Sequence, residues 1–328
     1  MSLTYESPGR AALHLARAAS LAPSPHNSQP WFFAEEGHDH GFEVHTGGRQ
    51  RMTVTDPGGR EAVIACGAAL FNVRIAVGRL GFRPAVDLLP EPGDSAFLAR
   101  VGYAAHAPVA PDEALMARAM PWRHTHRGLF GPDPVADTLL DDLRDHARAE
   151  GAVLQVVDGP EKLRLLADLV RVAENVHRSD PVHRAELTRC VGPYGVPVEV
   201  CGHHPDRTLL AGRDYLGVAL PSARRPRRWS PRTGTVAVLS THCDGRQDWL
   251  RSGQALQRVL LYAAAHHVMA AFHTQPLELP VLRAELRTQV TGGRFPQVIL
   301  RLGHATRTWS TPRRPPVEVL AREGVPAG

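Results

Sequence analysis

The stretch CGAALFNVRIAVGRLG, residues 66–81, has a counterpart later in the chain in SGQALQRVLLYAAAHH, residues 252–267. Without gaps, the two stretches align small and apolar residues: Gly67 with Gly253, Ala69 with Ala255, Leu70 with Leu256, and Val73 with Val259. Apolar residues recur at spacings of three and four, which is the pattern of a helix with a buried face. We therefore expect two buried helices, whose small residues let another segment approach the backbone closely.

Similar segments flank both helices. FLARVG at 97–102 and VILRLG at 298–303 are predicted strands, with Arg100 matching Arg301. Upstream, a predicted helix precedes a predicted strand in each case, at 11–22 and 31–36 and again at 136–151 and 152–158. Chance likeness of two alanine-rich helices is the alternative. The pattern predicts a duplicated α+β unit, with one half at 1–110 and the other at 111–328. Two-fold related halves form a self-complementary interface, where ligands often bind.

The composition bounds the class of protein. The chain has 328 residues, of which 43% are hydrophobic, enough for a large core. We find no apolar run approaching the roughly 20 residues that span a bilayer. The first ten residues, MSLTYESPGR, lack the apolar stretch of a secretory signal. These features predict a cytoplasmic protein. Four scattered cysteines without a CxxC pair argue against a disulfide framework or a zinc ribbon.

The basic residues are almost all arginine. The formal net charge is +5, and Lys162 is the single lysine among 38 basic residues. GC-rich codon usage explains most of this excess, whereas anion binding is the functional alternative. The densest run is ARRPRRWSPR at 223–232. A nucleic-acid patch is one interpretation of it. Because the run is short and broken by proline, a solvated loop or a lid over an anionic ligand is favoured.

The first polar cluster is APSPHNSQPW, residues 22–31. Its three prolines hold the backbone extended or turned. Ser24, Asn27 and Gln29 then offer donors and acceptors with little conformational entropy left to lose. This suits a planar ligand with polar edges. Ordinary turn chemistry at the end of a helix is the alternative.

The second cluster is RHTHRGLF, residues 123–130. Arg123, Thr125 and Arg127 alternate, so an extended backbone would place them on one face. Two guanidiniums and a hydroxyl on one face would bind phosphate, and a solvated basic turn is the alternative. We predict no metal here, since carboxylate and cysteine partners are lacking nearby. The same holds for CGHHPD at 201–206, for the pair at 266–267 and for His38 with His40.

Two further clusters contain proline. In STPRRPP, residues 310–316, Arg313 and Arg314 form a second candidate phosphate clamp or an exposed tail. In HTQPLELP, residues 273–280, Gln275 and Pro276 repeat the Gln-Pro pair of the first cluster, and backbone amides of this turn could meet a ligand edge. The chain has no GxGxxG, Walker, HExxH or GxSxG motif, which argues against the corresponding dehydrogenases, NTPases, proteases and hydrolases.

Taken together, these segments resemble the nitroreductase superfamily of flavin enzymes, and within it the Acg-type group. The matching segments are spread from residue 22 to residue 315, so the resemblance covers nearly the whole chain. It implies an α+β nitroreductase-like fold of two tandem pseudo-symmetric halves, each with a mostly antiparallel sheet packed by helices. Members are usually homodimers with FMN at the subunit interface. The Acg-type group resembles such a dimer fused into one chain, so we expect a monomer.

The resemblance also implies roles for the clusters. The residues expected along the flavin ring and ribityl chain are Ser24, Pro25, His26, Asn27 and Gln29. Those expected at the phosphate are Arg123, Thr125 and Arg127, helped by Arg313 and Arg314. Those expected near the isoalloxazine are Gln275, Pro276 and Leu277. The first half lacks the Arg-x-Thr-x-Arg segment and the second half lacks the Ser-Asn-Gln loop. Only one of the two pseudo-symmetric sites can then be complete, which predicts one FMN per chain.

The implied reaction is reduction of FMN by NAD(P)H, followed by electron transfer to a nitroaromatic, quinone or similar small-molecule acceptor. No residue of the motifs is identified as a general acid. The long segment at 190–232, rich in Pro, Gly and Arg, is predicted to be a lid-like insertion. A covered flavin would instead make the chain a flavin-sequestering protein with little reductase activity. Rapid reduction of the bound FMN by NADH or NADPH would indicate an enzyme, whereas a sequestering protein would not show it.

Overall fold

The computed structural model describes residues 9–37, 40–47, 51–201, 209–217, 230–305 and 307–321. Several segments discussed above lie outside the described residues: residues 223–229 of the basic run, 202–206 of CGHHPD, His38, and parts of the predicted lid at 190–232.

The first half contains a four-stranded antiparallel sheet in the order β1-β2-β4-β3. Its strands are β1 (Trp31–Glu36), β2 (Gly41–Thr46), β3 (Phe82–Leu88) and β4 (Phe97–His106). Helix α1 (Arg10–Ser20) precedes the sheet, and helix α2 (Arg60–Arg79) connects β2 to β3. Large buried side chains, among them Trp31, Phe33, Phe42 and Leu70, pack between this sheet and its helices.

The second half repeats this topology. Its sheet has the order β5-β6-β8-β7 and is also antiparallel. The strands are β5 (Val153–Val156), β6 (Thr235–Thr241), β7 (Val268–Phe272) and β8 (Phe295–His304). Helix α4 (Asp137–Ala149) precedes β5, and α8 (Arg246–Ala265) connects β6 to β7. The predicted α+β fold class, two antiparallel sheets packed by helices, is confirmed.

The remaining elements are insertions and connections. They are α3 (Pro111–Ala119), α5 (Pro160–Ser179), α6 (Pro181–Arg189), α7 (Val198–Cys201), α9 (Pro280–Gln289) and α10 (Pro316–Val319). Short 3-10 turns occur at η1 (Pro25–Asn27), η2 (Met120–Trp122), η4 (Pro231–Thr233) and η5 (Gln275–Glu278). The boundary predicted between residues 110 and 111 falls directly before α3, and it stays a prediction.

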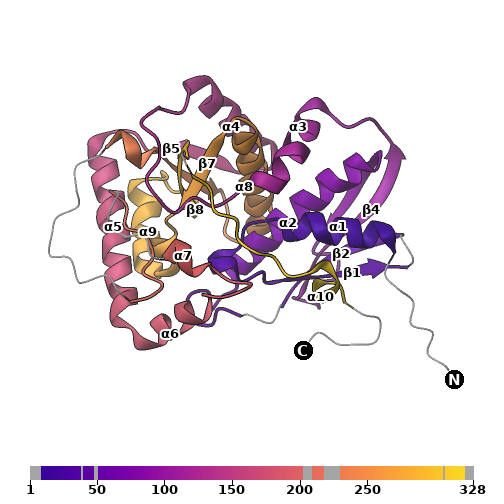
Figure 1. The fold of residues 1–328 in the computed structure, drawn as a ribbon, viewed down its shortest axis with the longest axis horizontal. Helices are drawn as coiled ribbons and strands as arrows, with labels where there is room; N and C mark the ends of the chain where they lie inside the picture. Colours follow the sequence, from indigo (N-terminus) through magenta and orange to yellow (C-terminus); the bar gives the residue numbers. More distant parts are fainter. Residues whose placement is uncertain are drawn as a thin grey trace.

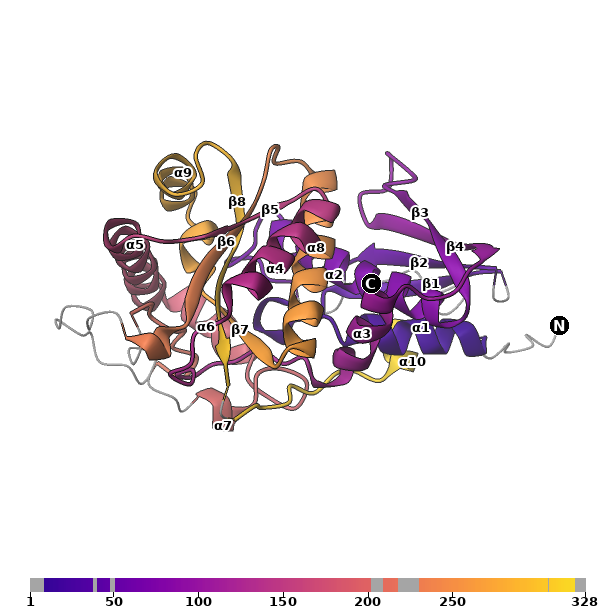
Figure 2. The same ribbon diagram turned by 90° about the horizontal axis from the view of Figure 1, so that it is seen from above.

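Helices α2 and α8 pack against each other between the two sheets (Figure 2). They contain all but the last two residues of each aligned stretch, and both begin six residues earlier than those stretches do. Their closest approach is at two glycines. A Cβ at Gly67 would lie 2.3 Å from the carbonyl oxygen of Leu250, and a Cβ at Gly253 would lie 2.0 Å from that of Ile64. Only glycine therefore permits this contact between the backbones.

Helix α2 is apolar enough to be mistaken for a membrane span. An 18-residue window of this helix has a mean hydropathy of 1.5, whereas the sequence pattern predicted no apolar run long enough to span a bilayer. However, 89% of the stretch is buried inside the protein. The helix is covered by α1, α8 and the first sheet, so it is a core helix here. The cytoplasmic compartment stays a prediction.

The C-terminal segment crosses from the second half to the first. After β8, residues 307–321 run across the molecule to α10, which packs on α1 and β1 (Figure 1). The N–H of Ala321 donates to the carbonyl of Phe33 at 2.6 Å, and Leu320 forms a parallel bridge with Phe33. We call residues 307–321 the strap. It links the halves independently of the α2–α8 contact.

The α2–α8 contact gives a stability prediction. Replacing Gly253→Ala should lower the free energy of unfolding by about 2 kcal/mol or more, because the new methyl would overlap backbone that cannot move aside. This loss outweighs the roughly 1 kcal/mol that alanine gains over glycine in a helix. Urea unfolding of the variant and of Gly58→Ala, whose Cβ would meet open space, checks it. An unchanged midpoint for Gly253→Ala would contradict the close contact.

Candidate functional site

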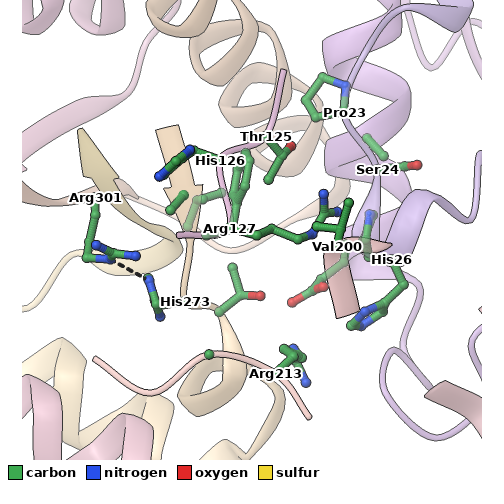
Figure 3. A pocket seen from close by; sticks show the side chains of 18 of the residues that line it. Pro23, Ser24, His26, Thr125, His126, Arg127, Val200, Arg213, His273 and Arg301 are labelled. Atoms are coloured by element: carbon green, nitrogen blue, oxygen red, sulfur yellow. Dashed lines mark hydrogen bonds between the residues drawn. The ribbon is translucent and has the colours of Figure 1, made fainter. Parts of the chain in front are cut away.

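A cavity of about 260 Å³ lies where the two halves meet (Figure 3). The first half contributes Pro23, Ser24, Pro25, His26, Glu61, Ile64 and Ala65. The second half contributes Thr125–Leu129, Val200, Cys201, Gly212, Arg213, Tyr215, Leu256, Ala271–Thr274, Gln297, Val298 and Arg301. Apolar helix and strand residues thus form part of the wall, and arginines from three different segments form another part.

The loop at 22–31 enters the cavity with an unusual backbone. His26, Asn27 and Gln29 have φ values of 51°, 59° and 49°, in the left-handed region that non-glycine residues seldom adopt. Each such residue costs on the order of 1 kcal/mol. The Ser24 hydroxyl accepts a hydrogen bond from the Gln29 N–H at 3.0 Å, which helps to close the loop. Strain of this kind is typical of sites where function fixes the backbone.

The amides of Asn27 and Gln29 bind neighbouring chain segments. Asn27 Nδ2 donates to the carbonyls of Tyr194 and Pro312 at 2.7 and 2.8 Å. Gln29 Nε2 donates to the Tyr194 carbonyl at 3.0 Å, and its Oε1 accepts from the Arg314 N–H at 2.9 Å. Both side chains therefore fasten the loop to the strap and to residues 194–195, and neither lines the cavity.

Three of the predicted arginines bind carbonyls of the first half. Arg313 donates from Nε to the Ser20 carbonyl at 2.7 Å, and Arg314 donates to the carbonyl of Gln29. Arg123 donates to the Leu21 carbonyl at 3.2 Å. Burial, with the neighbouring guanidiniums second, lowers the pKa of Arg123 to about 9. Because these three residues do not line the cavity, any effect on a ligand there would be electrostatic or through the loop.

Thr125 and Arg127 do line the cavity. The His126 N–H donates to the Ala270 carbonyl at 2.8 Å, and Thr125 forms a bridge with Ala270. The segment therefore extends the edge of β7, and in Figure 3 the side chain of Arg127 crosses the cavity toward His26. Arg127 Nη1 is buried and has no hydrogen-bond partner among the described residues. A buried, unpaired guanidinium nitrogen in a cavity calls for an anionic ligand.

Two cavity histidines are held neutral. His273 Nδ1 donates to the Ala211 carbonyl at 3.0 Å, so its Nε2 accepts from Arg301 Nε at 2.7 Å. Burial and then Arg301 hold the pKa of His273 well below its ordinary value. His26 Nδ1 lies 3.0 Å from the Tyr215 hydroxyl, and burial followed by Arg213 likewise holds its pKa well below the ordinary value. Neither imidazole is an acid at neutral pH.

A buried charged cluster lies behind the cavity. Arg213 forms an ion pair with Glu278, whose Oε2 is 3.5 Å from His177 Nε2 and 3.9 Å from His183 Nε2. Despite burial, Arg213 lowers the pKa of Glu278 to about 2. The two imidazoles stack 4.1 Å apart with planes 10° from parallel. A metal ion binds an imidazole nitrogen in the plane of its ring. A metal ion in the plane of one of these stacked rings would lie out of the plane of the other, so the geometry suits an ion-pair network.

The residues predicted to lie near the isoalloxazine are next to this charged cluster. Gln275 Nε2 donates to the Ala211 carbonyl at 3.1 Å and lies 3.4 Å from Glu174. The Leu277 N–H donates to the Thr274 carbonyl at 2.8 Å. Gln275, Pro276 and Leu277 are buried and do not line the cavity, whereas His273 and Thr274 just before them do. Their proposed place near a flavin ring stays a prediction.

Several cavity residues were missed by the sequence analysis. Glu61, Arg213 and Tyr215 belonged to no candidate set. His273 begins the cluster at 273–280 but was given no role, and Arg301 was noted only as a repeat position. Glu61 could have been found from one signal: a charged Arg-Glu pair begins a helix that is buried almost throughout. Arg213 and Tyr215 follow no periodic pattern, because they lie in an irregular segment.

The cluster predicts a pH-dependent stability effect. Arg213→Met would leave the Glu278 carboxylate buried without its cation and should cost about 3–5 kcal/mol at neutral pH. The folded-state pKa of Glu278 lies below the ordinary 4.5. The advantage of the wild type should therefore persist above pH 4.5 and shrink as pH falls toward 2. Chemical unfolding at several pH values checks this.

Arg171→Met is the matched control, because Arg171 pairs with Asp168 on an exposed helix face. Its effect should stay below about 1 kcal/mol. If the difference in unfolding free energy between Arg213→Met and the wild type did not change with pH, this would contradict the pairing of Arg213 with an ionised Glu278.

Comparison with known proteins gives the family. No family model matches the chain. The acg protein of Mycobacterium tuberculosis, whose name places it among the NAD(P)H nitroreductases, is 32% identical over 312 residues, covering 92% of each chain. A second M. tuberculosis protein with a NAD(P)H nitroreductase name is 32% identical over 298 residues, covering 88% of this chain and 83% of its own.

Solved structures give weaker matches. A Desulfitobacterium hafniense nitroreductase with bound FMN has a TM-score of 0.40 and 14% identity, covering 61% of this chain and 94% of its own. The FMN-dependent NfnB of Mycobacterium smegmatis, in complex with NADPH, has a TM-score of 0.39 and 16% identity, covering 62% and 96%. The similarity to these two sequence relatives shows that the chain belongs to the NAD(P)H nitroreductase family of oxidoreductases that includes acg, as its motifs predicted.

Proposed function

We propose that this chain is an FMN-dependent NAD(P)H oxidoreductase that reduces nitroaromatic or quinone-type acceptors through one FMN held between its halves. The observation that carries the proposal is the buried Nη1 of Arg127, which has no partner in the described part of the chain and lies in a cavity that both halves line. The cavity combines cationic groups with apolar walls such as Ile64, Leu256 and Val298. This combination fits a ligand with an anionic end and a planar, largely apolar ring.

Bound FMN would supply the hydride chemistry, while the chain supplies binding, orientation and access. We assign the phosphate to Arg127, with Thr125 beside it. Ser24, Pro25 and His26 would contact the ring or the ribityl chain from the strained loop. Asn27 and Gln29 would act indirectly, because their amides fix that loop to the strap.

The duplication supports one FMN per chain. In the gapless alignment of α2 with α8, Glu61 corresponds to Gln247, which is exposed and does not line the cavity. Likewise, Arg301 lines the cavity, whereas its counterpart Arg100 lies near Glu36 and Glu43 on the first sheet. In both pairs, the residue of one half lines the cavity and its counterpart in the other half does not. A single site within one fused chain also agrees with the expected monomer.

A second candidate function is flavin sequestration with little turnover. Val200, Cys201 and Tyr215, which lie within the predicted lid at 190–232, line the cavity. This segment is fastened to the first half by Asn27 and by the contact between His26 and Tyr215. The Glu186 carboxylate also accepts hydrogen bonds from the N–H groups of Val54 and Thr55. Such fastening would restrict the access of a nicotinamide.

An anaerobic titration of FMN-loaded protein with NADH and with NADPH tests the proposal. The expected result is rapid bleaching of the visible flavin absorbance with at least one of the two. If neither bleaches the flavin while dithionite does, the reductase proposal fails and sequestration is supported. If the protein does not bind FMN, both fail.

The role of Arg127 gives a binding prediction. Arg127→Ala should weaken FMN binding about ten- to a hundredfold, since a hydrogen bond to a charged group contributes about 1.5–3 kcal/mol. Riboflavin lacks the phosphate, so its affinity should change little. Arg148→Ala, on the exposed face of α4, serves as the charge-matched control. Fluorescence titration measures the affinities of the wild type and of both variants for FMN and for riboflavin. Equal losses for FMN and riboflavin would remove the phosphate assignment.

A further inference from the structure

Glu61 is a buried carboxyl group in the wall of the cavity. It lies in the first turn of α2, is only 6% exposed and lines the cavity opposite residues of the second half. Its Oε1 accepts a hydrogen bond from Arg60 Nη2 at 3.0 Å. Arg60 also donates from Nη1 to the carbonyl and the side-chain oxygen of Gln297 on β8, at 2.9 and 3.2 Å. The position of Glu61 is thus tied to both halves.

The surroundings of Glu61 favour its neutral form. Burial is the largest influence, and the negative charge of Glu278 on η5 is second. Asp56, in the turn before α2, acts in the same direction, whereas Arg60 and Arg213 oppose it. The net effect raises the pKa of Glu61 to about 8. A raised pKa of this kind is typical of groups that donate a proton near neutral pH.

The other titratable groups described in the cavity wall are less suited to this role. His26 and His273 are neutral and hold their Nδ1 atoms against Tyr215 and the Ala211 carbonyl. His126 directs Nε2 to the Leu129 carbonyl at 3.1 Å. Burial raises the pKa of Tyr215 and of Cys201 above values that are already alkaline. Among the described wall residues, Glu61 combines a transferable proton with access to the cavity.

We propose that Glu61 is the proton donor for the acceptor in this cavity. The inference rests on the proposed function. A quinone reduced to a hydroquinone takes up two electrons and two protons. The nicotinamide supplies both electrons and one proton as hydride and leaves oxidised. Glu61 supplies the second proton to a quinone oxygen, so that its O–H bond breaks as the new O–H bond forms. Water then reprotonates the carboxylate.

The test follows the reoxidation of dithionite-reduced, FMN-loaded protein by 1,4-benzoquinone in a stopped-flow instrument. The wild-type rate constant should be constant below about pH 8 and fall about tenfold per pH unit above it. Glu61→Gln, which keeps the shape, should react about a hundredfold more slowly at neutral pH and show no such fall. Glu61→Asp keeps a carboxyl and should retain the pH dependence. Glu285→Gln, on the exposed face of α9, should behave as wild type.

A second readout needs no flavin. Infrared spectra of the flavin-free protein, titrated from about pH 6 to about pH 10, should show a protonated-carboxyl band that disappears near pH 8. The band should be present in Glu285→Gln and missing in Glu61→Gln. This measurement remains valid if Glu61→Gln lowers stability, because the wild type alone must show the titration.

The outcomes separate the two proposals. A Glu61→Gln protein with the wild-type rate and pH profile overturns the role of Glu61, as does the lack of a titrating carboxyl band in the wild type. Failure of NADH and NADPH to bleach the flavin overturns the reductase proposal alone, because dithionite still permits the quinone step to be measured. Failure to bind FMN overturns both.

Discussion

The contact between the backbones of α2 and α8 at Gly67 and Gly253 sets the geometry of the whole molecule. It brings the two sheets to a fixed separation with both helices buried between them (Figure 2). The same helices provide walls of the cavity, through Glu61, Ile64 and Ala65 on α2 and Leu256 on α8. A shift at the glycines would therefore change the distance between ligand-facing groups of the two halves.

The cavity between the halves is asymmetric, although the two sheets share one strand order. The strap passes from the second half onto the first, and Asn27 and Gln29 hold it there through backbone groups of residues 312 and 314. Tyr194 and Tyr215 contact the same loop through Asn27 and His26. These contacts hold the left-handed backbone of His26, Asn27 and Gln29 in place, so that local strain is offset by bonds from distant parts of the sequence.

The sequence was sufficient for features that depend on local pattern. Helical periodicity predicted α2 and α8, and the repeated strands predicted two related sheets. Ser24, Thr125 and Arg127 were selected from stiff or alternating segments, and Pro25 and His26 from the family resemblance; all five line the cavity. Asn27, Gln29 and Arg313 were selected by the same reasoning but bind other parts of the chain, because motif composition does not reveal which partner a polar side chain will meet. Glu61, Arg213 and His273 acquire their properties from burial and from charged groups such as Glu278 and Arg301, which only the folded structure brings close to them.

The central claim is that the duplicated fold holds a single flavin site between unlike halves. Equilibrium dialysis of the purified wild-type chain against FMN, with bound flavin counted per chain, tests it most directly. One equivalent of FMN per chain is the result that this account predicts. Two equivalents would mean that both pseudo-symmetric sites are complete, and none would mean that the cavity holds a different ligand; either result would contradict it.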